Sequence, residues 1–235
     1  MRIVIYKAGN RPRMLELGVK LLLGYFVGSF LGSMVVGRLR GGVDIRTMGS
    51  GNAGGTNALR TQGLGFALGV VVIDVGKGAI AAGVIPAIQL PVLGDDPAIS
   101  RDWLQYACGA AAVVGHVWPM WHRFRGGKGA ATLIGTLIVL APALILPVLI
   151  VWAWVLTLFG YVGLATMIAG VTAPVWVGVT RLPDGQPLFV YCVALALFVL
   201  FTHRSNIHRM LAGTEPRNRS LMLFGRSQRP SMDDD

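Results

Sequence analysis

The sequence predicts an all-α integral membrane protein with about seven transmembrane helices and a site formed by glycine-rich loops at the cytoplasmic face. Hydrophobic residues make up 54% of the 235 residues and charged residues only 14%, against roughly a quarter charged in an ordinary globular domain. From Ala130 to Thr180 there is no Asp, Glu, Lys or Arg, and one span needs only about 20 apolar residues. The composition therefore excludes a soluble enzyme.

Apolar windows give the expected spans in chain order: Leu17–Val36, Leu64–Leu90, Trp103–Met120, Ala130–Thr180 and Pro187–Phe201. The fourth window is long enough for three short spans, and Pro147 and Gly160–Gly163 are the expected breaks because proline and glycine interrupt helices. We therefore expect a basic N-terminal extension over residues 1–16, a polytopic transmembrane domain over 17–215, and a disordered tail over 216–235.

Basic loops indicate which side of the membrane each connection occupies. Arg38–Arg60, Gly115–Thr132 and Thr202–Arg219 are basic and rich in glycine or amide side chains, as cytoplasmic loops are. Placing all three on one side requires seven crossings, with the N-terminus outside and the C-terminus inside. The basic residues before Leu21 favour the cytoplasm instead, so the N-terminus has two opposed indications. The net charge of +10 follows from these loops, and we expect no nucleic-acid partner.

The first basic stretch contains GSGNAGGTNALR, from Gly49 to Arg60. Its G-x-G-x-x-G spacing matches a dinucleotide loop, but the βαβ context that such a loop needs is missing. The glycines still allow backbone N–H groups to converge on a phosphate. The side chains that add hydrogen-bonding groups or positive charge suited to phosphate are Ser50, Asn52, Thr56, Asn57 and Arg60. The alternative is a flexible interfacial loop.

The second stretch, GHVWPMWHRFRGGKGAAT, places Gly126, Gly127, Lys128 and Gly129 directly before an apolar helix. It is not a Walker A motif, which requires Ser or Thr directly after the lysine. A helix N-terminus offers unpaired amides and the positive end of the dipole, so this stretch predicts phosphate binding by Lys128 and its flanking glycines. His116 and His122 in this stretch have no Cys, Asp or Glu beside them, and we expect no metal.

The third stretch carries His203 and Asn206, which share a helix face if the last span continues. A basic helix end reaching toward lipid headgroups is the alternative. Glu215 is expected to cap a helix or to pair with a loop arginine. In another segment, Asp74 and Lys77 lie three residues apart inside an apolar window, where charges are costly and usually paired. We predict a structural ion pair, with Lys77 as a secondary candidate for an anion contact.

Together these stretches resemble the bacterial membrane glycerol-3-phosphate acyltransferases that use acyl-phosphate as donor. GSGNAGGTNALR, GHVWPMWHRFRGGKGAAT and HRSNIHRMLAGTE occur in the family's order, with DVGKG between the first two. The resemblance covers roughly Gly28 to Glu215. Gly55 stands where the family usually has alanine, Ala130 is a common variant of valine, and Thr202 stands where arginine is frequent.

The resemblance implies a seven-span protein of the bacterial cell (inner) membrane with its site facing the cytoplasm. It implies transfer of a fatty acyl group from acyl-phosphate to the 1-hydroxyl of sn-glycerol 3-phosphate. The products are then lysophosphatidate and inorganic phosphate, in the first acylation of phospholipid synthesis. No cofactor is implied. The expected partners are the two substrates, membrane lipids and, as a candidate protein, the enzyme that makes acyl-phosphate.

Site roles follow from the three motifs. The predicted catalytic residues are His203, Asn206, Lys128 and Ser50. The predicted phosphate-binding set is Ser50, Asn52, Thr56, Asn57, Arg60, Gly126, Gly127, Lys128 and Gly129. His203 is a candidate base, and the alternative that matches the family is the substrate's own phosphate, whose second pKa is about 6. The competing class is a small transporter of phosphorylated metabolites, although such sites lie near the membrane midplane.

Overall fold

The computed structural model describes residues 15–91 and 99–223, and the regular elements in these ranges are helices. The α-helices are α1 Leu15–Ser29, α2 Gly32–Leu39, α3 Gly55–Gln62, α4 Leu64–Ala79, α5 Arg101–Val117, α6 Ala130–Leu140, α7 Ile145–Phe159, α8 Val162–Thr180, α9 Gln186–Thr202 and α10 Arg204–Leu211. Short π- and 3₁₀-helices, Ile80–Val84 and Ile85–Ala87, extend α4 directly. The all-α prediction is confirmed within these ranges.

Three helical segments of the described residues are long and apolar enough to cross a bilayer on their own: Leu64–Ala87, Pro142–Phe159 and Val162–Thr180. Two bent helix pairs would bring the number to five. These are α1 with α2, bent by 43°, and α9 with α10, bent by 52°. Helix α6, at Ala130–Leu140, is apolar but shorter.

The long charge-free window divides into α6, α7 and α8. The predicted break at Gly160–Gly163 is confirmed, because Gly160 ends α7 in the left-handed conformation. The predicted break at Pro147 is wrong. The chain turns at Ala141 and Pro142 instead, and Pro147 lies in the first turn of α7, where its missing N–H costs no intrahelical hydrogen bond.

The bend between α1 and α2 was not predicted from sequence. The hydroxyl of Ser29 donates to the carbonyl oxygen of Tyr25 at 2.8 Å, a contact that favours bending of a helix. The carbonyl of Phe30 then accepts from Nζ of Lys77 at 2.8 Å. The lysine therefore satisfies a backbone group that the bend leaves without a helical partner.

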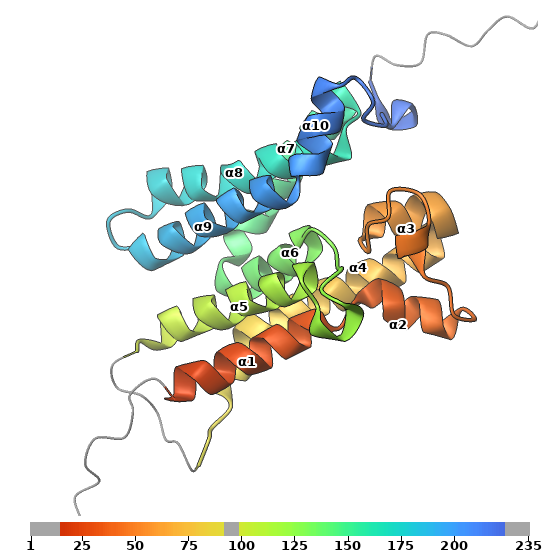
Figure 1. Ribbon diagram of the computed structural model, residues 1–235. Helices are drawn as coiled ribbons and strands as arrows, with labels where there is room; N and C mark the ends of the chain where they lie inside the picture. Colours follow the sequence, from red (N-terminus) through yellow and green to blue (C-terminus); the bar gives the residue numbers. More distant parts are fainter. Residues whose placement is uncertain (1–14, 92–98, 224–235) are drawn as a thin grey trace, which may run out of the picture.

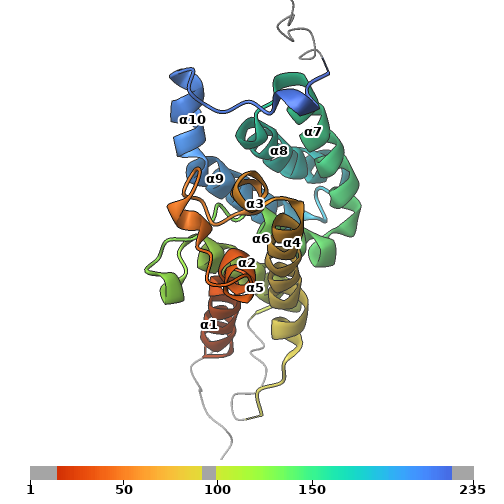
Figure 2. The same cartoon turned by 90° about the vertical axis from the view of Figure 1, so that its right-hand side faces the viewer.

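The helices pack as a bundle in which α1 contacts α5 and α4 contacts α6 as parallel pairs, while α8 contacts both α7 and α9 as antiparallel pairs (Figure 1). Close approach of α1 and α5 depends on glycine, since a Cβ at Gly28 would overlap the backbone of Ala112. Small residues at such contacts are typical of helix pairs in membranes. Both views show α3 and α10 at one end of the bundle, opposite the start of α1 (Figures 1 and 2).

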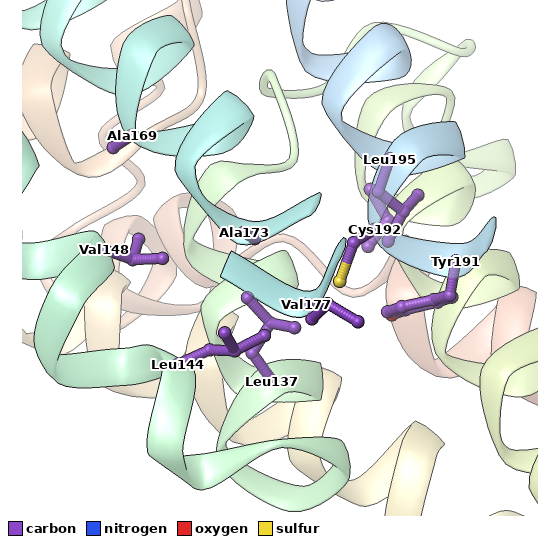
Figure 3. Close-up of a cluster of buried hydrophobic side chains, with 10 residues drawn as sticks. Leu137, Leu144, Val148, Ala169, Ala173, Val177, Tyr191, Cys192 and Leu195 are labelled. Atoms are coloured by element: carbon purple, nitrogen blue, oxygen red, sulfur yellow. The ribbon is translucent and has the colours of Figure 1, made fainter. Parts of the chain in front are cut away.

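The largest apolar cluster lies where α6, α7, α8 and α9 meet (Figure 3). Val177 of α8 and Tyr191 of α9 lie close together in it, with Leu144 from the turn before α7. Tyr191 is fixed in place, because its hydroxyl lies 2.6 Å from Oγ1 of Thr136. Val177, Leu144 and Tyr191 lie near the end of α8 and near the starts of α7 and α9, away from α10.

Of the tail expected over 216–235, the structure describes residues 216–223. The amide of Asn218 donates to the carbonyl of Gly160 at 2.7 Å, and that of Leu223 to Thr157 at 3.0 Å. The guanidinium of Arg217 lies over the Tyr161 ring. These residues therefore contact the turn between α7 and α8, while residues 224–235 and the N-terminal residues 1–14 lie outside the described ranges.

Candidate active site

The three sequence stretches meet around one cavity of about 520 Å³, here called the main cavity. Its polar end lies at the end of the bundle that carries α3 and α10. The predicted site residues that line it are Ser50, Asn52, Thr56, Asn57, Arg60, Lys128, Gly129, His203 and Asn206, together with Asp74 and Glu215. Ser50 and Glu215, which are 165 positions apart in sequence, thus line the same cavity.

Asn57 holds the first loop in shape. Its buried side-chain amide donates to the carbonyl oxygens of Ile45, Met48 and Asn52 at 2.8, 3.1 and 3.0 Å. Its Oδ1 accepts from the amide of Ser50 at 3.0 Å. Because one side chain replaces the hydrogen bonds that a helix or sheet would supply, the irregular loop keeps a defined conformation. Asn57 thus stabilises the loop, and its side-chain hydrogen-bonding groups are already used by protein groups.

Arg46 joins the first loop to the second. Its guanidinium pairs with Asp44 at 2.8 Å and reaches the carbonyl oxygens of His122 and Arg125 at 3.3 and 3.2 Å. Hydrogen bonding to Arg46 lowers the pKa of Asp44. Arg46 is not among the site residues predicted from the sequence. The signal was present, because Asp44 and Arg46 form the only D-x-R in the first basic stretch.

The second loop corrects one prediction about the glycines. The amides of Gly126 and Gly127 donate to the carbonyls of Val117 and His116 at 3.2 and 3.1 Å, so these two N–H groups are not free for phosphate. Both glycines are required sterically instead, since a Cβ at Gly127 would overlap the His116 ring. The amides of Lys128 and Gly129 donate to no group in the described ranges, and they precede α6.

Lys128 lies at the centre of the polar end. Its ammonium donates to Oδ1 of Asn206, and Nδ2 of Asn206 donates to Oε1 of Glu215 at 2.6 Å. The other oxygen of Glu215 accepts from Arg209 at 2.7 Å. Burial, together with the positive charge of Arg209, lowers the pKa of Lys128 to about 8. A basic helix end reaching toward lipid headgroups was the alternative for the third stretch, whereas Arg209 lines the main cavity and pairs with Glu215.

His203 is buried at the end of α9 and oriented by the backbone. Its Nδ1 lies 2.8 Å from the carbonyl oxygen of Val199, a geometry in which Nδ1 carries the proton and Nε2 is the basic nitrogen. The neighbouring Thr202 hydroxyl lies 3.0 Å from the carbonyl oxygens of both Val199 and Lys128. Thr202 therefore connects α9 to the second loop, a role that its motif position did not reveal.

The main cavity continues from its polar end into an apolar channel between α6, α7, α8 and α9. On α8 the lining runs from Gly163, beside Asn206, to Ala173. The ten residue steps from Gly163 to Ala173 correspond to about 15 Å of helix. Ala173 and Cys192 are the lining residues of α8 and α9 that lie farthest from α10, and they belong to the same apolar cluster as Val177, Leu144 and Tyr191 (Figure 3). The channel thus has cationic groups at its mouth and an apolar lining beyond it.

Asp74 and Lys77 form a buried network with His116, whose ring lies against Gly127 of the second loop. Nζ of Lys77 lies 2.8 Å from Oδ1 of Asp74 and 2.8 Å from Nδ1 of His116, and Oδ1 of Asp74 accepts from the amide of Gly32 at 3.0 Å. The network joins α4 and α5 to the start of α2. Across the described ranges, no three His, Cys, Asp or Glu side chains are grouped to hold a metal ion.

The fold and the cavity define a multi-pass helical membrane protein whose site combines anion-binding groups with an apolar channel. Comparison with known proteins gives the family. A family model described as glycerol-3-phosphate acyltransferase matches residues 19–213. The chain therefore belongs to the glycerol-3-phosphate acyltransferase family, and the resemblance carried by its three motifs is confirmed.

Curated relatives and solved structures agree with this assignment. The glycerol-3-phosphate acyltransferase of Rhodospirillum rubrum is 42% identical over 203 residues, which cover 86% of this chain and 91% of the relative. That of Synechococcus sp. strain CC9902 is 40% identical over 198 residues, 84% of this chain and 92% of the relative. Crystal structures of PlsY, an integral membrane glycerol 3-phosphate acyltransferase, in glycerol 3-phosphate and lysophosphatidic acid forms, match with a TM-score of 0.73 and 30% identity over 86% of this chain and 94% of PlsY.

Proposed function

We propose that this chain transfers a fatty acyl group from acyl-phosphate to the 1-hydroxyl of sn-glycerol 3-phosphate, giving lysophosphatidate and inorganic phosphate. The observation that carries the choice of donor is the main cavity, in which Lys128 and Arg60 lie directly at the mouth of an apolar channel. In acyl-phosphate the phosphate is attached directly to the acyl chain. The phosphate can therefore lie against Lys128 and Arg60 while the chain occupies the apolar channel. The glycerol 3-phosphate and lysophosphatidic acid forms of PlsY support the acceptor and the product.

The proposed topology has seven crossings, with the loops on the cytoplasmic side of a bacterial cell membrane. In support, α1, α5, α7 and α9 run toward the end of the bundle that carries the loops, and α4, α6 and α8 run away from it (Figure 1). This direction of travel puts the start of α1 on the opposite side. Arg38, Arg40, Arg46 and Arg60 lie at the loop end, as cytoplasmic loops favour.

In the proposed reaction the 1-hydroxyl oxygen attacks the carbonyl carbon of the donor. The bond from that carbon to the phosphate oxygen breaks, and phosphate leaves with the electron pair. Lys128, Arg60 and Ser50 bind phosphate oxygens, so that the negative charge on the leaving group meets fixed positive charge and donors. Asn52 and Thr56 donate further hydrogen bonds. Since the donor is an activated anhydride, positioning supplies much of the required acceleration.

Two groups can take the hydroxyl proton in this proposal. One is Nε2 of His203, which the contact between Nδ1 and Val199 leaves as the basic nitrogen. The other is a phosphate oxygen of the substrate, which takes the proton directly. In the first case His203 then passes the proton to the departing phosphate, so that the histidine returns to its neutral form. His203→Gln separates them, because glutamine retains hydrogen bonding and cannot act as a base. Activity within a few-fold of wild type would exclude His203 as an essential base, and a loss of 100-fold or more would favour it.

The test of the function is a comparison of donors on purified protein in detergent. Glycerol 3-phosphate would be supplied with palmitoyl-phosphate, palmitoyl-CoA or acylated carrier protein, and both lysophosphatidate and phosphate measured. We expect turnover with palmitoyl-phosphate alone, lost in Lys128→Ala and retained in Arg181→Ala, which removes an exposed cation at the far end of α8.

Turnover with palmitoyl-CoA alone would reject the proposed donor. No product from any donor, with folded protein, would reject the enzyme. Uptake of glycerol 3-phosphate into proteoliposomes that contain no acyl donor would then support the transporter alternative.

A further inference from the structure

A second cavity of about 290 Å³, here called the side cavity, adjoins the polar end of the main cavity. The two share Ser50, Asn52, Lys128 and Arg209 in their walls. Lys128 stands between them, because its ammonium contacts Asn206, which lines only the main cavity. A solute in the side cavity would therefore reach Lys128 without crossing the apolar channel.

The charged side chains that line the side cavity are all cationic. Its walls carry three cationic side chains, those of Lys128, Arg204 and Arg209, and no Asp or Glu among the described lining residues. Its other polar side chains include Ser50, Asn52, Thr202 and Ser205. The main cavity, in contrast, is lined mostly by apolar residues below its mouth. The two cavities thus suit different solutes, a hydrophilic anion in one and an acyl chain in the other.

Arg204 supplies the uncompensated charge of the side cavity. Arg209 is paired with Glu215 at 2.7 Å, whereas Arg204 has no acidic partner within the described ranges. The Arg204 side chain is nevertheless held in place. Its guanidinium lies 4.5 Å from the centre of the Phe201 ring and donates to the Phe201 carbonyl at 3.1 Å. Such a fixed and exposed guanidinium attracts phosphate dianions from water.

We propose that the side cavity is the aqueous route by which a small phosphate monoester dianion, glycerol 3-phosphate, reaches Lys128, and that Arg204 captures it there. The amphiphilic donor takes the main cavity from the lipid side. This inference rests on the proposed function. It adds a separate access route for each substrate and a specificity-determining residue for the acceptor.

Steady-state kinetics of Arg204→Gln provide the first test. We expect the KM for glycerol 3-phosphate to rise about five- to tenfold at low salt, with kcat and the KM for acyl-phosphate within twofold of wild type. Added salt should reduce the difference in this KM between Arg204→Gln and wild type, because salt screens the long-range attraction between Arg204 and the phosphate. Arg204→Lys should restore most of the affinity. The control is Arg40→Gln, which removes an exposed charge at the same end of the bundle but outside both cavities.

An equal rise in KM for Arg204→Gln and Arg40→Gln would overturn the assignment of Arg204. An equal rise in the KM values for acyl-phosphate and glycerol 3-phosphate in Arg204→Gln would also overturn it, because it would indicate a general disturbance of the site.

Thiol labelling tests the route without any acyl donor and without relying on Arg204. Ser205→Cys places a thiol in the wall of the side cavity, and the native Cys108 and Cys192 are both buried. We expect glycerol 3-phosphate to slow modification by a charged thiosulfonate at least fivefold, and glycerol to have no effect. Thr180→Cys, exposed at the far end of α8, should react at an unchanged rate.

The absence of protection by glycerol 3-phosphate would overturn the proposed route. Protection by phosphatidylglycerol micelles alone would assign the cavity to a lipid headgroup and reject the acceptor route. Since labelling needs no turnover, protection of Ser205→Cys combined with no activity from any donor would reject the proposed function while retaining the anion route.

Discussion

Asn206 connects Glu215 to Lys128 through the two ends of one side-chain amide, donating to Glu215 at 2.6 Å and accepting from Lys128. Because a carboxylate can only accept, Glu215 determines which end of the amide faces Lys128. We expect Glu215→Ala to lower kcat/KM for glycerol 3-phosphate by roughly 10- to 100-fold, the cost of losing a hydrogen bond to a charged group. Asp184→Ala, which removes an exposed carboxylate at the opposite end, is the control. Equal activities of the two variants would contradict this role.

The pH dependence of kcat/KM should reflect the pKa of Lys128 in the free enzyme. Burial lowers this pKa to about 8, and only the charged ammonium attracts phosphate. The rate constant should therefore fall as the pH rises through about 8, on the basic side of a profile measured with glycerol 3-phosphate. In Lys128→Arg the guanidinium stays charged, so any residual activity should lose this basic limb. A limb unchanged in Lys128→Arg would assign it to another group.

Asn57→Ala should destabilise the first loop and the protein with it. The Asn52 carbonyl loses its donor and the Ser50 amide loses its acceptor, while the Ile45 and Met48 carbonyls keep the amides of Met48 and Gly51. The cost is about 1–3 kcal/mol for each buried group left unsatisfied. We expect a lower thermal midpoint in detergent by several degrees and a drop in turnover. Gln62→Ala, on the same helix, is the control, since within the described residues the side-chain amide of Gln62 donates to the Met48 sulfur at 3.4 Å and to no buried group. A midpoint equal to that of the control would show that the loop is held by other contacts.

The α8 wall of the main cavity predicts a dependence on acyl chain length. An extended acyl chain advances about 1.25 Å per carbon, so the α8 wall of about 15 Å from Gly163 to Ala173 runs beside roughly 12 carbons, a depth that a 16-carbon chain reaches and an 8-carbon chain does not. Ala173→Leu adds bulk to this wall beside Cys192. We expect kcat/KM for a 16-carbon donor to fall at least fivefold, and that for an 8-carbon donor to stay within twofold. Ala194→Leu, on the exposed face of α9, should leave the profile unchanged. A parallel loss at all lengths would reject this role of the wall.

Most of the fold was predictable because apolar windows and loop charge are local signals. The windows Trp103–Met120 and Pro187–Phe201 correspond to α5 and α9 within a few residues. The bend after Ser29 was not predictable in this way, since the carbonyl of Phe30 that it leaves open is satisfied by Lys77, 47 positions further along the chain. The break predicted at Pro147 was wrong for a related reason. A proline can stand at a helix break or in the first turn of a helix, and here the turn at Ala141 and Pro142 places Pro147 in the first turn of α7.

The candidate site was predictable where glycine, amide and cationic residues cluster in sequence, as they do around Ser50 and Lys128. The sequence could not show that the Gly126 and Gly127 amides are already paired, because their acceptors belong to the preceding helix end. Nor could it reveal the contact of Thr202 with the Lys128 carbonyl, which spans 74 positions. Long-range hydrogen bonds of this kind have no signature in a single chain.

Asp74 and Lys77 also bear on how the protein enters the membrane during synthesis. Both charges belong to α4, where they lie one helical turn apart and pair at 2.8 Å. A lone charge is costly to insert at the centre of a bilayer, but α4 carries its own counter-ion and can be delivered by the translocon as a neutral pair. Charge balance in this helix therefore does not have to wait for α1 or α5 to assemble around it.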